Sequence, residues 1–150
     1  MSQSINLYNQ LANHKLFNKS VNFGLKRIKL ALALLGHPEK KLKNVISVVG
    51  ESGKFTTLFS LKSFIEASNQ NVTTHISPSL RDIRERFYMG EKYLGHKEIK
   101  KTIKQIEKLN IPLTIFECLT LVYIINASKI NVDYNIQETG ALWRLDSNNI

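Results

Sequence analysis

The chain has 150 residues, of which 43% are apolar and 22% are charged, and this composition predicts one globular domain with a single hydrophobic core. The longest apolar run, Cys118 to Ile125, is far shorter than the roughly 20 residues that span a bilayer, and with no secretory signal and one cysteine we expect a cytoplasmic protein without a membrane partner. The net charge of +9 favours anionic partners. However, the basic residues are spread along the chain and show no aromatic-basic signature of a nucleic-acid module, so we interpret them as solvated helix faces and loops in preference to a nucleic-acid-binding surface.

The first half of the chain predicts a helix, a strand and a second helix. Apolar residues from Phe23 to Leu35 recur at near-helical spacing before Gly36 and Pro38, which predicts a helix of about three to four turns. The β-branched run of residues 43–49 is typical of a buried strand. Residues 56–69 place four apolar side chains on one helical face: Leu58, Leu61, Phe64 and Ile65.

The second half continues the alternation of strands and helices. Residues 71–77 predict a strand, 96–109 an amphipathic surface helix, 112–128 a buried helix and 132–138 a final strand that ends before Gly140. Strands that alternate with helices indicate an α/β fold, with a mainly parallel sheet flanked by helices. The expected domain covers residues 1–150 without an internal boundary.

A glycine-rich loop follows the first predicted strand. Its pattern is G-x-x-G-K-x-[ST], with Gly50, Gly53, Lys54 and Thr56 at the defined positions, and it lacks the spacing of a standard phosphate-binding loop. The order strand, glycine loop, helix is the one in which a helix N-terminus meets phosphate. Because a short glycine-lysine motif is weak evidence alone, Lys54 as an ordinary helix-start residue and Thr56 as a helix cap stay open as alternatives.

The loop resembles G-T-N-G-K-G-S of the folylpolyglutamate synthase/dihydrofolate synthase family, a branch of the Mur ligase superfamily. Three further segments resemble family motifs in the same order. They are the opening "NFGLKRIKLALALLGHP", the segment "HISPSLRDIRERF" and the C-terminal "LTIFECLT…VDYNIQETGALWRLDSNN". The resemblance implies the N-terminal part of a Mur-ligase-type ATPase domain, from which the C-terminal ligase domain is absent.

The resemblance implies an ATP-dependent ligase that joins L-glutamate to a folate through an acyl phosphate, with Mg²⁺ as the metal. It assigns ATP binding to Gly50, Ser52, Gly53, Lys54 and Thr56, metal binding to Thr56 and Glu138, and folate binding to Ser77, Pro78, Glu85 and Arg86. No catalytic residue is assigned. We expect the strand that ends at Glu138 to lie beside the loop strand, which would bring the carboxylate near Thr56. Its alternative reading is a solvated strand end, and Glu117 is either a family residue or part of a local hydrogen-bond network.

The chain also departs from the family pattern. Glu51 places a negative charge in the loop, Phe55 replaces a glycine, and Leu142 and Trp143 occupy two further glycine positions. Because the family's downstream segments are absent, a complementing C-terminal domain is one expectation for an active enzyme. The alternatives are a non-catalytic remnant of a decaying ligase gene and a basic polyanion-binding module. We expect Cys118 to be a small buried hydrophobic residue and assign no role to the four histidines.

Overall fold

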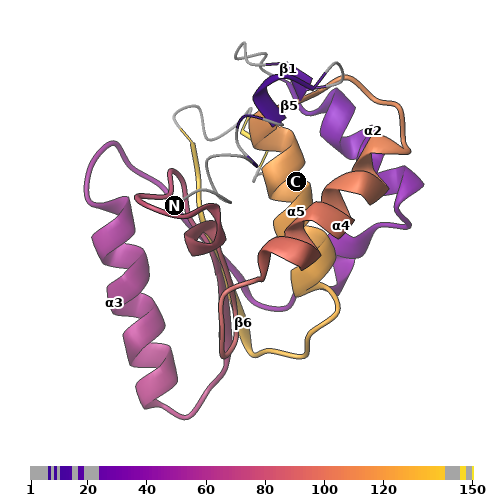
Figure 1. Ribbon diagram of the computed structural model, residues 1–150. Coiled ribbons are helices and arrows are strands. Elements are labelled where there is room, and N and C mark those ends of the chain that lie inside the picture. Colours follow the sequence, from indigo (N-terminus) through magenta and orange to yellow (C-terminus); the bar gives the residue numbers. More distant parts are fainter. Residues whose placement is uncertain are drawn as a thin grey trace.

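The computed structural model describes residues 7, 9, 11–14, 17–18, 24–140, 146–147 and 150. Their helices and strands are, in chain order, β1 (Phe17–Asn18), α2 (Lys26–Leu34), η1 (Pro38–Lys41), β2 (Val45–Val48), α3 (Lys54–Ala67), β3 (Val72–His75), η2 (Ile83–Arg86), β4 (Phe87–Met89), α4 (His96–Glu107), β5 (Leu113–Thr114), α5 (Ile115–Ala127) and β6 (Tyr134–Glu138). Figure 1 shows α3 on one side of the sheet and α5, α4 and α2 on the other. The layered α/β arrangement expected from the sequence is therefore confirmed.

The main sheet has the strand order β2-β6-β3-β4. β6 lies parallel to both β2 and β3, whereas β4 runs antiparallel to β3. The short strands β1 and β5 pair separately and in parallel. The sheet is thus mainly parallel, as predicted. β4 was not predicted, since a three-residue strand directly after a charged segment carries no periodic signal of its own.

The end of α2 follows the predicted glycine stop. Gly36 adopts a φ of 75°, its amide donates to the Ala33 carbonyl, and the His37 amide donates to the Leu32 carbonyl. These two bonds are the pair of a Schellman motif, in which glycine takes the left-handed position without steric cost. Pro38 then opens η1, so the chain leaves the helix where the sequence indicated.

Helix α5 forms the centre of the larger core, as its apolar sequence predicted. A capping box begins it, because the Thr114 side chain accepts from the Glu117 amide and the Glu117 carboxylate accepts from the Thr114 amide. Arg27 of α2 pairs with the same carboxylate at 3.1 Å. Glu117 therefore serves a local structural network, the second of its two readings. Cys118 is fully buried, and burial raises the pKa of its thiol, so the hydrophobic role is confirmed.

A smaller apolar cluster lies between α3 and the sheet. It consists of Val48, Leu58, Ile65, Val72, Ile76 and Ile136, with four partly buried residues packed against it. The prediction that Phe64 shares this buried face was wrong, since Phe64 is 71% exposed. β2 is also less buried than predicted, because Val45 is 45% exposed on the edge strand of the described sheet. None of the described helices is long and apolar enough to cross a membrane.

Candidate functional site

The glycine loop joins the carboxyl end of β2 to the start of α3. Gly53 is the N-cap residue of α3 and has a φ of 77°, a left-handed conformation that favours glycine. No side chain caps the helix, and its first turn contains no acidic residue. The amides of the first turn therefore lack an intrahelical partner at the positive end of the helix dipole, an arrangement that suits an anion.

Lys54 turns its side chain back over this loop. Its ammonium group donates to the carbonyl oxygen of Gly50 at 2.9 Å and to that of Glu51 at 3.3 Å. The same nitrogen lies 3.9 Å from Oε1 of Glu138. The lysine thus places a positive charge directly at the loop, and its neighbours come from the loop itself and from the end of β6.

Glu138 ends β6, which is the strand beside β2. Val48 and Glu138 are register partners, so the carboxylate emerges next to the start of the glycine loop. The expectation that the Glu138 strand lies beside the loop strand is confirmed. Glu138 is only 6% exposed, and its Oε2 accepts a hydrogen bond from the Ser77 amide at 3.0 Å. A solvated strand end is therefore excluded as its reading.

The oxygen groups at this edge suit a hard divalent cation. Mg²⁺ prefers oxygen ligands and usually takes one or two carboxylates together with substrate phosphates and water. Glu138 supplies a carboxylate, and Thr56 supplies an exposed hydroxyl group in the first turn of α3. A close approach of Glu138 to Thr56 stays a prediction. The described residues contain no group of three or more His, Cys, Asp or Glu side chains arranged for a metal ion.

The Phe55 side chain does not stand alone at the loop. Its ring contacts the ring of Phe59 one helical turn further on, with centroids 4.4 Å apart. Phe55 is 43% exposed, so part of the ring faces solvent along α3. Phe59 thus packs against the ring along the helix, and the effect of Phe55 on phosphate binding stays a prediction. Glu51 is exposed, and its effect on phosphate stays a prediction.

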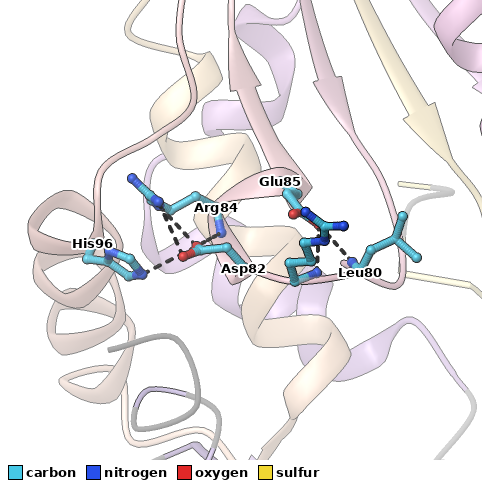
Figure 2. Close-up of polar contacts among 6 residues, drawn as sticks. Leu80, Asp82, Arg84, Glu85 and His96 are labelled. Atoms are coloured by element: carbon cyan, nitrogen blue, oxygen red, sulfur yellow. Dashed lines mark hydrogen bonds and ion pairs between the residues drawn. The ribbon is translucent and has the colours of Figure 1, made fainter. Parts of the chain in front are cut away.

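The second candidate segment, Ser77–Arg86, follows β3 at the same edge. Figure 2 shows the Glu85 side chain turned toward the loop tip, where its Oε2 accepts from the amides of Leu80 and Arg81 at 2.7 and 3.1 Å. At the base, the Arg86 guanidinium donates to the Ser77 hydroxyl at 3.0 Å. Glu85 and Arg86 thus contact the segment itself. Folate binding by Ser77, Pro78, Glu85 and Arg86 stays a prediction.

Asp82 and His96 form a contact that the sequence analysis missed. Asp82 accepts from the Arg84 amide and side chain, and its Oδ1 lies 3.3 Å from Nε2 of His96 at the start of α4 (Figure 2). Partial burial opposes ionisation of Asp82, but the Arg84 hydrogen bonds and the nearby His96 outweigh it and lower its pKa. An Asp directly before the short helix η2 was the available signal, because this residue type often caps helices.

The structure brings four candidate residues together: Lys54, Glu138, Ser77 and Arg86. Leu142 and Trp143, which replace two glycines of the family pattern, lie outside the described residues. Together the fold and the site define a mainly parallel α/β domain with a glycine loop and a buried carboxylate at the carboxyl edge of its sheet. Ligands of open α/β sheets bind at this edge.

Known proteins are similar to this chain in both sequence and fold. Dihydrofolate synthase/folylpolyglutamate synthase from Bacillus subtilis (strain 168) is 31% identical over 136 residues, which cover 85% of this chain and 31% of that protein. The Escherichia coli FolC structure in complex with DHPP and ADP matches 97% of this chain and 35% of that chain, with a TM-score of 0.87 and 31% identity. A bifunctional folylpolyglutamate synthase/dihydrofolate synthase with Mn, AMPPNP and L-glutamate bound has a TM-score of 0.81 and 30% identity, and the match covers 88% of this chain and 33% of that chain.

These similarities establish a family rather than a complete enzyme. The chain belongs to the folylpolyglutamate synthase/dihydrofolate synthase family. It spans about a third of the length of the curated relatives that it matches. No family model matches the chain.

Proposed function

We propose that this chain binds ATP with Mg²⁺ and forms the nucleotide-binding part of a cytoplasmic ligase that adds L-glutamate to folates. The observation that carries the proposal is Lys54, whose ammonium group lies over the glycine loop and 3.9 Å from Glu138. A lysine and open helix amides neutralise phosphate charge. The loop residues Gly50, Ser52, Gly53, Lys54 and Thr56 would contact the nucleotide.

Thr56 and Glu138 would hold the metal, which supplies neutralisation of phosphate charge when bound. Glu138 suits this role because one of its oxygens is fixed by Ser77 while the other faces Lys54. When ATP enters, its phosphates would replace the two loop carbonyls as partners of the Lys54 ammonium group. The lysine would then orient the γ-phosphoryl group for transfer to a folate carboxylate, which would release ADP, and an incoming amine would attack the acyl carbon and displace phosphate.

We place the folate at the segment Ser77–Arg86, which lies at the same sheet edge as the glycine loop. Solved relatives are described as complexes with DHPP and ADP or with L-glutamate, which supports these substrate classes for the family site. Ser77 and Pro78 would line the substrate side. Glu85 and Arg86 would act by holding the segment in its folded form, because their side chains contact its backbone and Ser77.

The described fold corresponds to part of an ATP-binding domain, and residues outside this sequence would complete it together with a C-terminal ligase domain. The position of β2 supports this proposal, because β2 has a strand neighbour on only one side among the described residues. Val45 of β2 and Val49 directly after it are also about half exposed. Parallel strands are normally covered on both faces. We expect the chain alone to self-associate through such apolar surface, and a monomer with low binding of a hydrophobic dye would count against this completion.

The direct test is calorimetric titration of the folded chain with ATP, with and without Mg²⁺. We expect magnesium-dependent binding that Lys54→Ala weakens roughly 10- to 100-fold, because a charge-assisted hydrogen bond contributes about 1.5–3 kcal/mol. Lys97→Ala, an exposed substitution on α4, is the matched control and should bind as the parent chain does. Equal binding by the Lys54 variant would refute the proposed role of the loop.

A second candidate is a non-catalytic remnant, and Glu51 and Phe55 are the observations that favour it. Both residues are exposed at the loop, where they add charge and bulk. If the folded chain gives no heat with ATP, Glu51→Thr combined with Phe55→Gly should restore binding in a remnant whose loop alone has decayed. A basic polyanion module would instead bind generic oligonucleotides in a salt-sensitive manner without competition from ATP.

A further inference from the structure

Arg86 closes the base of the segment Ser77–Arg86 in two ways. Its backbone carbonyl accepts from the Ile76 amide at 3.2 Å, and its guanidinium group donates to the Ser77 hydroxyl at 3.0 Å. Arg86 is only 7% exposed although it carries a permanent charge. The backbone bond is enough to join the two arms of the segment. The side-chain bond therefore adds a separate constraint, which acts on Ser77.

The constraint on Ser77 reaches the nucleotide side of the sheet edge. The Ser77 amide donates to Oε2 of Glu138 at 3.0 Å. The other oxygen, Oε1, lies 3.9 Å from the Lys54 ammonium group. A continuous path of contacts therefore runs from Arg86 through Ser77 and Glu138 to Lys54, and it joins η2, the segment after β3, the end of β6 and the start of α3.

This path fixes the plane of the Glu138 carboxylate, and with it the direction in which the oxygen near Lys54 points. The terminal torsion of a glutamate side chain is broad, so the carboxylate plane turns unless a donor holds one of its oxygens. The Ser77 amide is such a donor, and it holds its direction only while Ser77 itself is fixed. Groups that hold a metal ligand in place in this manner commonly change metal affinity when they are removed.

We propose that Arg86 is a positioning residue, which acts through Ser77 to orient the Glu138 carboxylate for a divalent cation at the glycine loop. This inference rests on the proposed function for the identity of the ligand. In this arrangement Arg86 would act on the metal through Ser77 and Glu138. Its removal should therefore weaken metal binding while binding of the nucleotide without metal is retained.

The test uses Mn²⁺ as a spectroscopic substitute for Mg²⁺ and AMPPNP as a nucleotide that is not hydrolysed. Electron paramagnetic resonance gives the affinity for Mn²⁺ at saturating AMPPNP, and calorimetry without metal gives the affinity for AMPPNP. For Arg86→Ala we expect Mn²⁺ affinity to fall roughly 10- to 100-fold while metal-free AMPPNP affinity changes less than about threefold. Arg86→Lys keeps one donor and should restore part of the loss.

Arg84→Ala is the matched control, because Arg84 lies two residues away in η2 and pairs with Asp82 at the surface. It should leave both affinities unchanged. If Arg86→Ala does not fold, Ser77→Ala decides the question, since it removes the acceptor hydroxyl and should lower Mn²⁺ affinity similarly. Unchanged Mn²⁺ affinity in a folded Arg86→Ala or Ser77→Ala variant, or an equal loss of metal-free nucleotide binding, would overturn the inference.

A measurement without ligand separates this inference from the proposed function. The amide NMR signal of Ser77 should shift in Glu138→Gln, because the amide donates to that carboxylate. The shift should be much smaller when Glu138→Gln is combined with Arg86→Ala, if Arg86 directs Ser77 toward Glu138. A chain that binds no nucleotide refutes the proposed function alone, whereas an equal Ser77 shift with and without Arg86 refutes the positioning role.

Discussion

The two segments at the carboxyl edge of the sheet are held in opposite ways. The glycine loop between β2 and α3 is exposed, and its side-chain bonds come from Lys54 to its own carbonyl groups. The segment Ser77–Arg86 carries Ile83 into the core and is braced by Glu85 at its tip and Arg86 at its base. The first segment therefore depends on its backbone geometry and on one side chain, Lys54, and no side chain caps the helix that follows it, whereas the side chains of Glu85 and Arg86 preorganise the second.

Ile83→Ala should give the largest effect, because it removes the buried anchor of the braced segment. Ile83 is fully buried in the larger core, so we expect a loss of about 2–5 kcal/mol in the free energy of unfolding, measured by urea denaturation. Leu80→Ala is the matched control in the same segment. Leu80 is 81% exposed and should change stability by less than about 0.5 kcal/mol. Equal effects would show that the segment is not anchored by Ile83.

Gly53→Ala tests whether backbone geometry shapes the glycine loop. Nothing lies within 4 Å of the position that a Cβ atom would take, so the cost arises from the φ of 77° alone. We expect a loss of roughly 1–2 kcal/mol in the free energy of unfolding. Ser52→Ala, at the exposed neighbouring position, should change it by less than about 0.5 kcal/mol. A neutral Gly53→Ala would argue against a left-handed residue at the helix start.

Glu85→Gln sharpens the comparison at the loop tip. The carboxylate accepts from two backbone amides, and its replacement by a neutral amide group should cost about 1 kcal/mol. Amide hydrogen exchange at Leu80 and Arg81 should become faster, while exchange in the glycine loop should stay the same. Glu91→Gln, an exposed substitution near β4, serves as the control. Unchanged protection of both amides would contradict the bracing role.

The smallest effect concerns Asp82, whose pKa is lowered in the folded protein. A lowered carboxyl pKa contributes stability above the unfolded value of about 3.9, and this contribution is lost as the pH falls through the folded pKa. The parent chain should therefore exceed Asp82→Asn in stability by about 0.5 kcal/mol near neutral pH, and the difference should vanish in acid. Urea denaturation across this pH range measures it, and a difference independent of pH would contradict the charge-based account.

The sequence predicted the elements whose signals are local. Gly36 and Pro38 set the end of α2, and the isoleucines of α4 lie on its buried face as their spacing indicated. The apolar run of β2 suggested burial on both sides, but its coverage depends on which strand lies beside it, and residues close in sequence do not specify this. The prediction for Phe64 was wrong because α3 buries only a narrow stripe of side chains against the sheet, and the width of that stripe depends on the packing of the helix.

For the candidate site too, the sequence predicted some features, whereas others depend on how the chain folds. Motif order placed the glycine loop and Glu138 at one sheet edge, since parallel strands end together there. The roles of Glu85 and Arg86 depend on the folded path of the segment around them, which no spacing rule describes. Asp82 and His96 are separated in sequence and meet only because Ile83 brings η2 into the core that α4 also joins.

The most direct test of the central claim is amide hydrogen exchange of the chain with and without AMPPNP and Mg²⁺. If the glycine loop is the phosphate site, protection should rise at the amides from Gly50 to Thr56, while Leu80 and Arg81 keep the protection that Glu85 already gives them. The same exchange in both states at the glycine loop, in a folded sample with saturating nucleotide, would contradict the account.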